Sequence, residues 1–206
     1  VLIVNPAVPP TSPWIQLARS SGVRVTTATA LLLEHNPARV VAITGTHGKS
    51  STASFARDLI ASTLDSSGRC LLGGNIGGSL LEHLDDLSER DVLVLELSSY
   101  QLEHLPQDVK RTVDVAAITN IGVDHLERHG TAVRYRDTKL QLMNLVREGG
   151  VSVVPHGELA ELARQQTVER LVTHGAAGDF RLDGAEAFDH TGKTAVQVAD
   201  TSALCV

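Results

Sequence analysis

The stretch that most constrains the fold runs from Val40 to Ser51 and reads VVAITGTHGKSS. It opens with an apolar run, Val-Val-Ala-Ile, rich in β-branched residues, as expected for a strand that is buried on both faces. Gly45, Gly48, Lys49 and Ser50 follow, and a helical pattern begins directly after them. A strand, a glycine-containing loop, Lys-Ser and a helix occur in this order in loops that cradle phosphate groups.

Each part of this order has a chemical reason. Glycines let backbone N–H groups approach oxygen anions, and a helix N-terminus adds about half a positive charge. We expect Lys49 to reach the terminal phosphates of a nucleotide and the hydroxyl of Ser50 to ligate Mg²⁺. The match is incomplete, because the general pattern has a glycine where this chain has Ile43. The alternative is a tight strand-to-helix turn with a surface lysine.

Strands and helices alternate from Val40 to about Val154, which predicts an α/β fold with a mostly parallel sheet flanked by helices. We predict strands at 40–44, 92–96, 115–119 and 151–154, and helices at 51–64, 78–87, 131–147 and 157–166. In the first helix the predicted buried face comprises Phe55, Ala56, Leu59, Ile60, Thr63 and Leu64. Ligands of such sheets bind beyond the carboxyl ends of the strands. The polar clusters Thr44–Ser50, Glu96–Ser99 and Thr119–His125 therefore predict one composite site.

The two flanks of this α/β unit have different patterns. Residues 1–39 contain predicted strands at 2–4 and 23–26 and a helix at 12–20, too little to bury both faces of a sheet. We therefore predict that 1–39 are the end of an N-terminal domain and that 40–206 form a central domain, with Asn36-Pro37 at the boundary. Beyond Glu169, short strands at 180–182, 186–189 and 194–198, with a turn at 189–192, predict a small antiparallel β section.

Composition argues against several classes of protein. The net charge is −6, from 18 basic and 24 acidic residues, and there is no basic run, so nucleic acid is not an expected partner. No apolar stretch approaches the roughly 20 residues of a membrane helix, and the start of the chain does not resemble a signal peptide. Two distant cysteines, Cys70 and Cys205, favour a reducing, cytoplasmic location. Since the chain opens in mid-strand without a methionine, we expect a fragment or a processed form.

Further side chains are candidates for the same edge of the sheet. Glu96 ends a buried strand and supplies the hard oxygen ligand that Mg²⁺ prefers, unless it caps a helix or pairs with a surface lysine. Ser98 is either another oxygen ligand or a helix cap. Asn75 lies in the glycine cluster 73–78, which either brings backbone and amide close to a substrate or forms a flexible turn. His125 gains weight only from its place at this edge, because a lone histidine is usually structural or solvated.

Lys139 is unusual because Leu142, Met143 and Val146 place it on the apolar stripe of the predicted helix 131–147. A buried ammonium is costly and usually loses its charge. A neutral amine can react with CO₂ to give a carbamate, an anion that could bind metal. The alternative is a lysine that extends from the helix edge to water, and the residues alone favour that interpretation.

Five motifs occur together and in order: GTHGKS (45–50), GNIG (74–77), ELSSYQLE (96–103), NIGVDH (120–125) and YRDTK (135–139). In these motifs the chain resembles the Mur ligases, ATP-dependent amino-acid ligases of peptidoglycan precursor synthesis. Within the family, ELSSYQLE resembles the form of the members that add D-glutamate to UDP-N-acetylmuramoyl-L-alanine. His47 departs from those members, which more often have asparagine there. The resemblance is strong over about 40–155 and weak over 1–39.

The resemblance implies a mechanism and a role for each matched residue. A substrate carboxylate attacks the γ-phosphate of ATP, and the amine of the incoming amino acid displaces phosphate from the acyl phosphate. Lys49, Glu96, His125 and Lys139 are the implied catalytic residues. Asn75 and Ser98 are the implied contacts to the muramoyl substrate and its surroundings. The residues implied to bind ATP are Gly45, Thr46, His47, Gly48, Lys49, Ser50 and Ser51.

Two Mg²⁺ ions are implied at the site. Ser50 and Glu96 would hold one ion, and His125 with a carbamylated Lys139 would serve the second. The resemblance therefore favours burial of Lys139 over the water-exposed alternative. The family also has a third domain that binds the amino acid, so we expect the 206-residue chain alone to be inactive.

Other interpretations remain open at this point. One is a different member of the superfamily, such as the alanine-adding ligase or a folylpolyglutamate synthase. Another, from a different class, is a non-catalytic ATP-binding module. For the ligase we expect UDP-N-acetylmuramoyl-L-alanine, D-glutamate and ATP as small-molecule substrates, no nucleic-acid or membrane partner, and a monomer.

Overall fold

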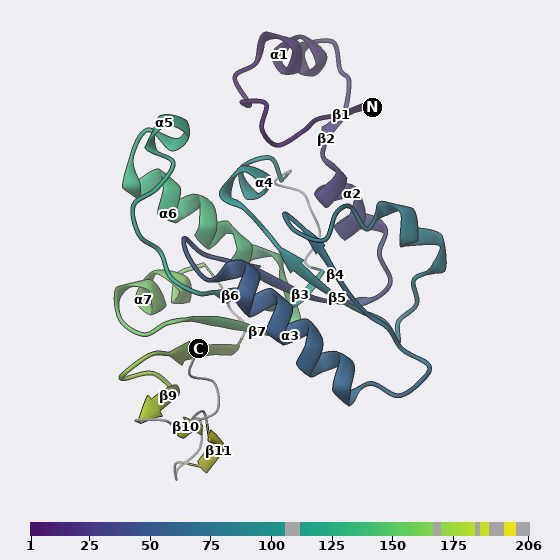
Figure 1. Cartoon of the computed structure of the whole chain (residues 1–206). Coiled ribbons are helices and arrows are strands. Elements are labelled where there is room, and N and C mark those ends of the chain that lie inside the picture. Colours follow the sequence, from purple (N-terminus) through teal and green to yellow (C-terminus); the bar gives the residue numbers. More distant parts are fainter. Residues whose placement is uncertain (106–111, 167–169, 184–185, 190–195, 201–206) are drawn as a thin grey trace.

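The computed structural model describes residues 1–105, 112–166, 170–183, 186–189 and 196–200. They form a two-stranded parallel sheet near the N-terminus and a nine-stranded sheet that makes up the body of the molecule (Figure 1). The large sheet has the strand order β11-β10-β9-β8-β7-β6-β3-β5-β4. Its strands are β3 (Arg39–Thr44), β4 (Cys70–Gly74), β5 (Val92–Glu96), β6 (Val113–Ile118), β7 (Val146–Pro155), β8 (Arg170–His174), β9 (Phe180–Asp183), β10 (Glu186–Asp189) and β11 (Val196–Asp200).

The central part of the large sheet is parallel, which confirms the predicted fold class. The strands from β4 through β5, β3, β6 and β7 to β8 all pair in parallel. β9, β10 and β11 pair antiparallel at the other end of the sheet. Residues 190–192 of the predicted turn 189–192 and the first residues of the predicted strand 194–198 lie outside the described residues.

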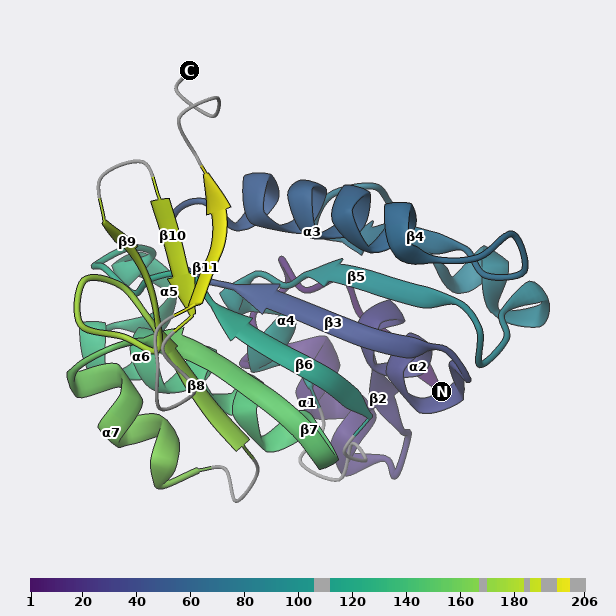
Figure 2. The same ribbon diagram turned by 90° about the horizontal axis from the view of Figure 1, so that it is seen from below.

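Helices cover both faces of the sheet (Figure 2). α3 (Lys49–Thr63) lies on one face, where Ile43, Ala53 and Val94 form a small core. α2 (Ala28–His35), α4 (Ser99–Glu103), α6 (Ala132–Leu140) and α7 (Glu158–Arg164) contribute to a larger core on the opposite face. The short elements η1 (Leu81–Asp86), α5 (Leu126–His129) and η2 (Gln141–Leu145) are the remaining helical elements in the described residues after Ala28.

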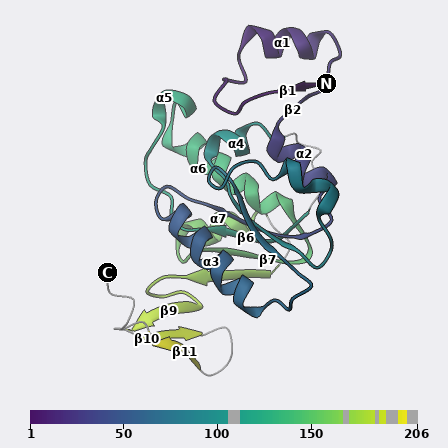
Figure 3. The same cartoon turned by 45° about the vertical axis from the view of Figure 1, so that its right-hand side comes forward.

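The N-terminal segment lies at one end of the molecule, away from β9–β11 (Figure 3). β1 (Leu2–Ile3) and β2 (Val25–Thr26) pair in parallel, with α1 (Pro13–Ser20) between them in the chain. The next helix, α2, contributes Leu32 and Leu33 to the larger core of the main sheet. The division of the chain into domains at residue 39 stays a prediction.

The predicted buried face of α3 is wrong in part. Phe55 and Leu59 are each 69% exposed, whereas Ala56 and Ile60 pack against the smaller core as predicted. The fully buried side chain of this helix is Ala53, which is not among the predicted residues. A small residue lets the helix backbone approach the sheet closely, so the contact line runs through Ala53, Ala56 and Ile60.

Other local predictions need correction. The predicted helix 78–87 is the 3₁₀ element η1, and the predicted helix 131–147 ends as α6 at Leu140, followed by η2. β7 already begins at Val146, so the apolar stripe after Lys139 runs through η2 into a strand. α2, β4 and β8 were not predicted, since each is a short element without a clear period. Among the described residues, no helix is long and apolar enough to cross a bilayer.

The turn after β4 depends on Gly74, whose φ is +99°. A Cβ at this position would lie 2.2 Å from the carbonyl oxygen of Glu96 on the neighbouring strand. Gly78 in the same loop also has a positive φ, +88°, but a Cβ there would meet no atom within 4 Å. The two glycines therefore separate the cost of backbone conformation from the cost of a steric clash.

We expect Gly74→Ala to destabilise the chain by about 3 kcal/mol or more, because it combines a positive φ with a clash against backbone. Gly78→Ala is the matched control and should cost only about 1 kcal/mol. Urea denaturation followed by circular dichroism measures both values. Equal losses for the two variants would contradict the close approach of β4 to β5.

Candidate functional site

The carboxyl ends of three neighbouring strands meet at one edge of the large sheet. Ile43 of β3 is in register with Glu96 of β5, and Thr44 is in register with Ile118 of β6. Gly74 at the end of β4 is in register with Glu96 as well. The segments that follow these strands therefore lie side by side, as the sequence predicted from the polar clusters.

The loop between β3 and α3 has the geometry of an anion cradle. Gly48 adopts a left-handed conformation, with φ +76°, and precedes the first residue of α3. No side chain caps this helix, so its first N–H groups are available to a ligand. Lys49 Nζ donates to the carbonyl oxygen of Thr46 at 2.8 Å, which holds the ammonium over the loop.

The end of β6 holds the other side of this loop. The backbone N–H of His47 donates to Asn120 Oδ1 at 2.9 Å, and Asn120 Nδ2 donates back to the carbonyl oxygen of His47 at 2.9 Å. Thr119 Oγ1 donates to the same carbonyl oxygen at 2.7 Å. A Cβ at Gly45 would lie 1.9 Å from Thr119 Oγ1, so only glycine fits this approach. The loop is thus fixed before any ligand binds.

Glu96 is a buried carboxylate with one unpartnered oxygen. It is 1% exposed, and its Oε1 accepts a hydrogen bond from Asn75 Nδ2 at 2.9 Å. Its Oε2 is buried and has no hydrogen-bond partner. Because buried carboxylates are normally paired or bound to a metal, this oxygen fits a cation at the end of β5. The alternatives of a helix cap or a surface lysine partner do not hold for Glu96.

The donors around Glu96 suit Mg²⁺ better than a metal that needs a complete protein cage. In the described parts of the chain, no group of three or more His, Cys, Asp and Glu side chains could hold a metal ion. Mg²⁺ usually takes only one or two carboxylates and completes its shell with water and phosphate oxygens. One carboxylate at the end of β5, next to the strand that leads into the phosphate-type loop, matches that requirement.

Lys139 is buried, so the interpretation of a lysine reaching out to water is wrong. It is 1% exposed, its Nζ lies 3.4 Å from Thr44 Oγ1, and it sits 4.8 Å from the centre of the Tyr135 ring. Burial, together with the charge of Lys49, lowers the pKa of Lys139 to about 7, against the opposing effects of Asp124 and Glu96. A large fraction of Lys139 is therefore a neutral amine at neutral pH.

Thr44 brings Lys139 to the ends of β3 and β5, because Thr44 Oγ1 lies 3.4 Å from Lys139 Nζ and donates to the carbonyl oxygen of Leu97 at 2.7 Å. Tyr135 connects Lys139 to the loop between β3 and α3, because its hydroxyl lies 3.2 Å from Thr46 Oγ1. Thr46 Oγ1 also accepts from the backbone N–H of Gly122 at 2.9 Å. The segments after β3 and β6 and the helix α6 are therefore tied together at this edge.

His125 lies at the outer side of this cluster. Its backbone is in the left-handed region, with φ +50°, and its side chain is 44% exposed. Its ring centre lies 6.2 Å from that of Tyr135, whose face also meets Lys139, and 5.1 Å from that of Tyr100. The structure therefore brings His125 next to the Lys139 region through Tyr135, while no direct contact joins His125 to Glu96.

Ser98 acts as a helix cap in this structure. Its hydroxyl accepts from the backbone N–H of Gln101, and the Gln101 side chain accepts from the backbone N–H of Ser98, which is a complete capping box. Asn75, by contrast, is exposed apart from its contact to Glu96 and remains accessible to a ligand.

His129 is a buried residue of this region that sequence reasoning missed. It is 1% exposed, its Nε2 lies 3.0 Å from Ser99 Oγ, and its ring packs 5.4 Å from that of Tyr135. Burial lowers the pKa of His129, which favours the neutral ring. Nothing in the spacing of the histidines signals this burial, because Ser99 is 30 residues away in the chain.

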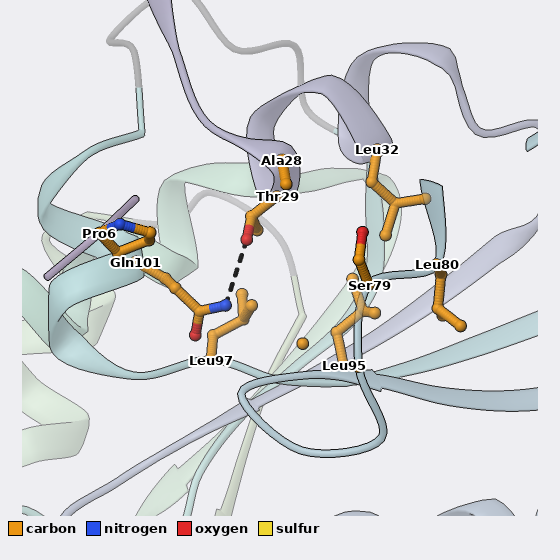
Figure 4. Close-up of a pocket in the computed structure, with 11 residues that line it drawn as sticks. Pro6, Ala28, Thr29, Leu32, Ser79, Leu80, Leu95, Leu97 and Gln101 are labelled. Carbon is orange, nitrogen blue, oxygen red and sulfur yellow. Dashed lines mark hydrogen bonds between the residues drawn. The ribbon is translucent and has the colours of Figure 1, made fainter. Parts of the chain in front are cut away.

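A cavity of about 160 Å³ lies next to the loop 74–80, between that loop and the N-terminal segment (Figure 4). Its walls are mainly apolar and include Leu32, Leu95 and Leu97. Pro6, Gly74, Gly78, Ser79 and Leu80 also line it. Gln101 Nε2 donates to Thr29 Oγ1 at 3.2 Å across its wall. The cavity thus joins the N-terminal segment to the loop that carries Asn75.

Residues 43–204 match the Mur ligase middle domain family. The chain belongs to the Mur ligase family. It is 32% identical over 184 residues to the UDP-N-acetylmuramoylalanine--D-glutamate ligase of Koribacter versatilis, covering 85% of this chain and 39% of that protein. It is 37% identical over 165 residues to the UDP-N-acetylmuramoyl-L-alanine--L-glutamate ligase of a Micromonospora species, covering 80% of this chain and 33% of that protein.

Solved structures of Mur ligases share the fold. The structure of MurF ligase from Thermotoga maritima in complex with ADP superposes with a TM-score of 0.58 at 20% identity, covering 89% of this chain and 51% of that chain. The Mur ligase chain described here therefore spans less than half the length of the two relatives above.

The buried amine of this Mur ligase domain makes its stability depend on pH. Unfolded Lys139 keeps its proton up to about its ordinary pKa of 10.5, whereas the folded residue loses it near a pKa of about 7. Between these values the unfolded chain binds more protons, so this residue makes stability rise with pH, by up to about 1.4 kcal/mol per pH unit.

We expect Lys139→Met to remove that slope and to be more stable than the wild type at pH 6, because methionine fills similar space without a charge. Urea titrations from pH 6 to 10 in CO₂-free buffer measure the difference between the two proteins. A difference that does not change with pH would contradict the burial of the amine.

Proposed function

We propose that this chain is the ATP-binding core of a ligase that adds D-glutamate to UDP-N-acetylmuramoyl-L-alanine in peptidoglycan precursor synthesis. The observation that carries the proposal is the buried Glu96 carboxylate, which has one unpartnered oxygen. It lies at the same edge of the sheet as the loop before α3, a helix without a side-chain cap, and as the buried Lys139. Such a cluster is costly in an ordinary turn and is suited to a triphosphate with its metal.

The loop after β3 would bind the phosphates of ATP. The residues from Gly45 to Ser51 supply backbone N–H groups at the start of α3, and the ammonium of Lys49 would move from the carbonyl oxygen of Thr46 to the terminal phosphates. Phosphoryl transfer depends mainly on positioning and on neutralising charge, and this loop is already fixed by Asn120 and Thr119.

Two metal positions are part of the proposal. Glu96 Oε2 and Ser50 would hold one Mg²⁺, and His125 with a carbamylated Lys139 would serve the second. Bound Mg²⁺ would neutralise the charge of the phosphate oxygens. The unpartnered oxygen of Glu96 supports the first position, and the shared contact of His125 and Lys139 with Tyr135 supports the second.

The carbamate on Lys139 would form when its neutral amine attacks CO₂ and releases one proton. The reaction needs an unprotonated amine, and the pKa of about 7 at this buried position supports it. The product would be an anion in place of a potential cation, which removes the repulsion between Lys139 and a metal. It would also face Lys49 with an opposite charge.

The acceptor would bind on the Asn75 side of the site. Asn75 is exposed, and its amide is oriented by Glu96, so it is available to a muramoyl substrate. The substrate carboxylate would then attack the γ-phosphate, and the amine of glutamate would displace phosphate from the acyl phosphate. Ser98 would act in this site through the position of α4 rather than as a metal ligand.

The added amino acid is either D-glutamate or L-glutamate, and we propose D-glutamate. The motif Glu96–Glu103 and relatives such as the one from Koribacter versatilis favour D-glutamate. The relative from Micromonospora carries the name of an L-glutamate ligase, so L-glutamate is the second candidate. A cytoplasmic, monomeric enzyme is expected in both cases.

The decisive assay measures phosphate release by a polypeptide of the relatives' full length that contains this chain. With ATP, Mg²⁺ and UDP-N-acetylmuramoyl-L-alanine, we expect release with D-glutamate and little with L-glutamate or L-alanine. Lys49→Met should reduce kcat/KM for ATP by about 100-fold or more, because it removes a charge from the phosphates. The exposed Arg134→Met is the matched control and should behave as the wild type.

The other outcomes discriminate the alternatives. Release with L-glutamate alone would assign the second candidate, and release only with L-alanine or with a folate acceptor would refute glutamate addition. Binding of ATP and Mg²⁺ without turnover under any of these conditions would indicate a non-catalytic module.

A further inference from the structure

Arg128 connects the N-terminal segment to the proposed active site. Its side chain is 9% exposed, and its Nε donates to Glu103 Oε2 at 2.7 Å. Its two terminal nitrogens reach three consecutive backbone carbonyl oxygens of a loop more than 100 residues away in the chain. The contacts are Nη1 to Ala7 at 3.1 Å, and Nη2 to Pro6 at 3.1 Å and to Val8 at 3.3 Å.

The loop is shaped to present these carbonyl groups. Asn5 Oδ1 accepts from the backbone N–H of Ala7 at 2.9 Å, and the Asn5 carbonyl oxygen accepts from the N–H of Val8 at 3.0 Å. Pro6 has no N–H to satisfy. The donors of the loop are therefore used within it, and its carbonyl oxygens are free to accept from the guanidinium.

A second contact strengthens the same attachment. His104 Nε2 lies 2.7 Å from the carbonyl oxygen of Val8 and 3.2 Å from Arg128 Nη2. Burial lowers the pKa of His104, which favours a neutral ring that donates through Nε2 to Val8. The loop is thus held from α4, through His104, and from α5, through Arg128.

Arginine suits this position better than lysine would. A guanidinium carries five N–H donors in a planar fork, so it can reach a carboxylate and several carbonyl groups at once. Its face lies 4.8 Å from the centre of the Tyr100 ring, and the Tyr100 hydroxyl lies 3.4 Å from His125 Nδ1. Arg128 therefore contacts both the N-terminal loop and the ring that packs on His125.

The loop that Arg128 holds, residues 6–8, also borders the cavity of about 160 Å³ next to the loop 74–80. Pro6 lines this cavity together with Gln101, and Ser79 lies on its opposite side (Figure 4). Gly74 and Gly78 of the same loop also line it. The distance between Pro6 and the loop that carries Asn75 therefore depends on how firmly residues 6–8 are attached.

We propose that Arg128 is a positioning residue for the acceptor. It fixes residues 6–8 of the N-terminal segment against α4 and α5. In this way it sets the binding surface for the nucleotide-linked acceptor between that segment and the loop 74–80. The proposal rests on the proposed ligase function for its kinetic consequence. Its structural consequence, attachment of the loop, does not depend on activity.

The structural test uses the 206-residue chain. In Arg128→Met, amide hydrogen exchange of Ala7 and Val8 should become about 10-fold faster or more, because the loop loses its attachment. Arg128→Lys should give an intermediate rate, since an ammonium can satisfy only part of the contacts. Arg134→Met, on the exposed side of α6, is the matched control and should leave both rates unchanged. Exchange in Arg128→Met equal to that control would overturn the proposal.

The kinetic test uses a polypeptide of the relatives' full length that contains this chain. Arg128→Met should raise KM for the acceptor about 10-fold or more while KM for ATP stays within about 2-fold, and Arg128→Lys should restore part of the loss. An equal rise of both KM values, or no rise, would overturn the positioning role. If Arg128→Met does not fold, Glu103→Gln and Arg128→Lys replace it in the test. The same two quantities are then compared with the wild type, namely KM for the acceptor and KM for ATP.

Failure of the two proposals can be told apart. An inactive wild type with fast loop exchange in Arg128→Met contradicts the ligase function and leaves the attachment supported. An active wild type whose acceptor KM does not respond to Arg128 contradicts the positioning role alone.

Discussion

Parallel pairing of β3, β5 and β6 is the constraint on which the site depends, because it brings the carboxyl ends of these strands to one edge. At this edge the chain buries a carboxylate, Glu96, and an amine, Lys139, that would be cheaper in water. The larger core lies on the face of the sheet opposite to α3 and includes side chains of α2, α4, α6 and α7, and its burial offsets that cost. Glu96 takes its position from the end of β5, whereas Lys139 reaches the same edge of the sheet from α6.

The alternation of strands and helices could be predicted because it depends on local patterns. Buried parallel strands are continuously apolar, and the run from Val92 to Leu95 shows this directly. The buried side of α3 could not be predicted in the same way. Phe55 and Leu59 are large apolar side chains of that helix, yet both are exposed, whereas the small Ala53 is fully buried against the sheet. Distance between layers is a tertiary property that periodicity does not record.

The candidate residues of the site could be predicted from the sequence, but most of the contacts that hold them in place could not. Lys49 and Glu96 follow buried strands at the expected edge, so their position was readable from the sequence. Burial of Lys139 was ambiguous from the residues alone, because a lysine at a helix edge can also reach water. The roles of Asn120 in fixing the loop and of His129 behind Tyr135 depend on partners far away in the chain, and no local pattern indicates them.

A crystal structure of this chain with a non-hydrolysable ATP analogue and Mn²⁺, with the metal located by its anomalous scattering, would show most directly what binds at this edge of the sheet. We expect the triphosphate on the loop from Gly45 to Ser51 and a metal peak next to Glu96 Oε2. A nucleotide or metal bound elsewhere, with Glu96 still unpartnered, would contradict this expectation.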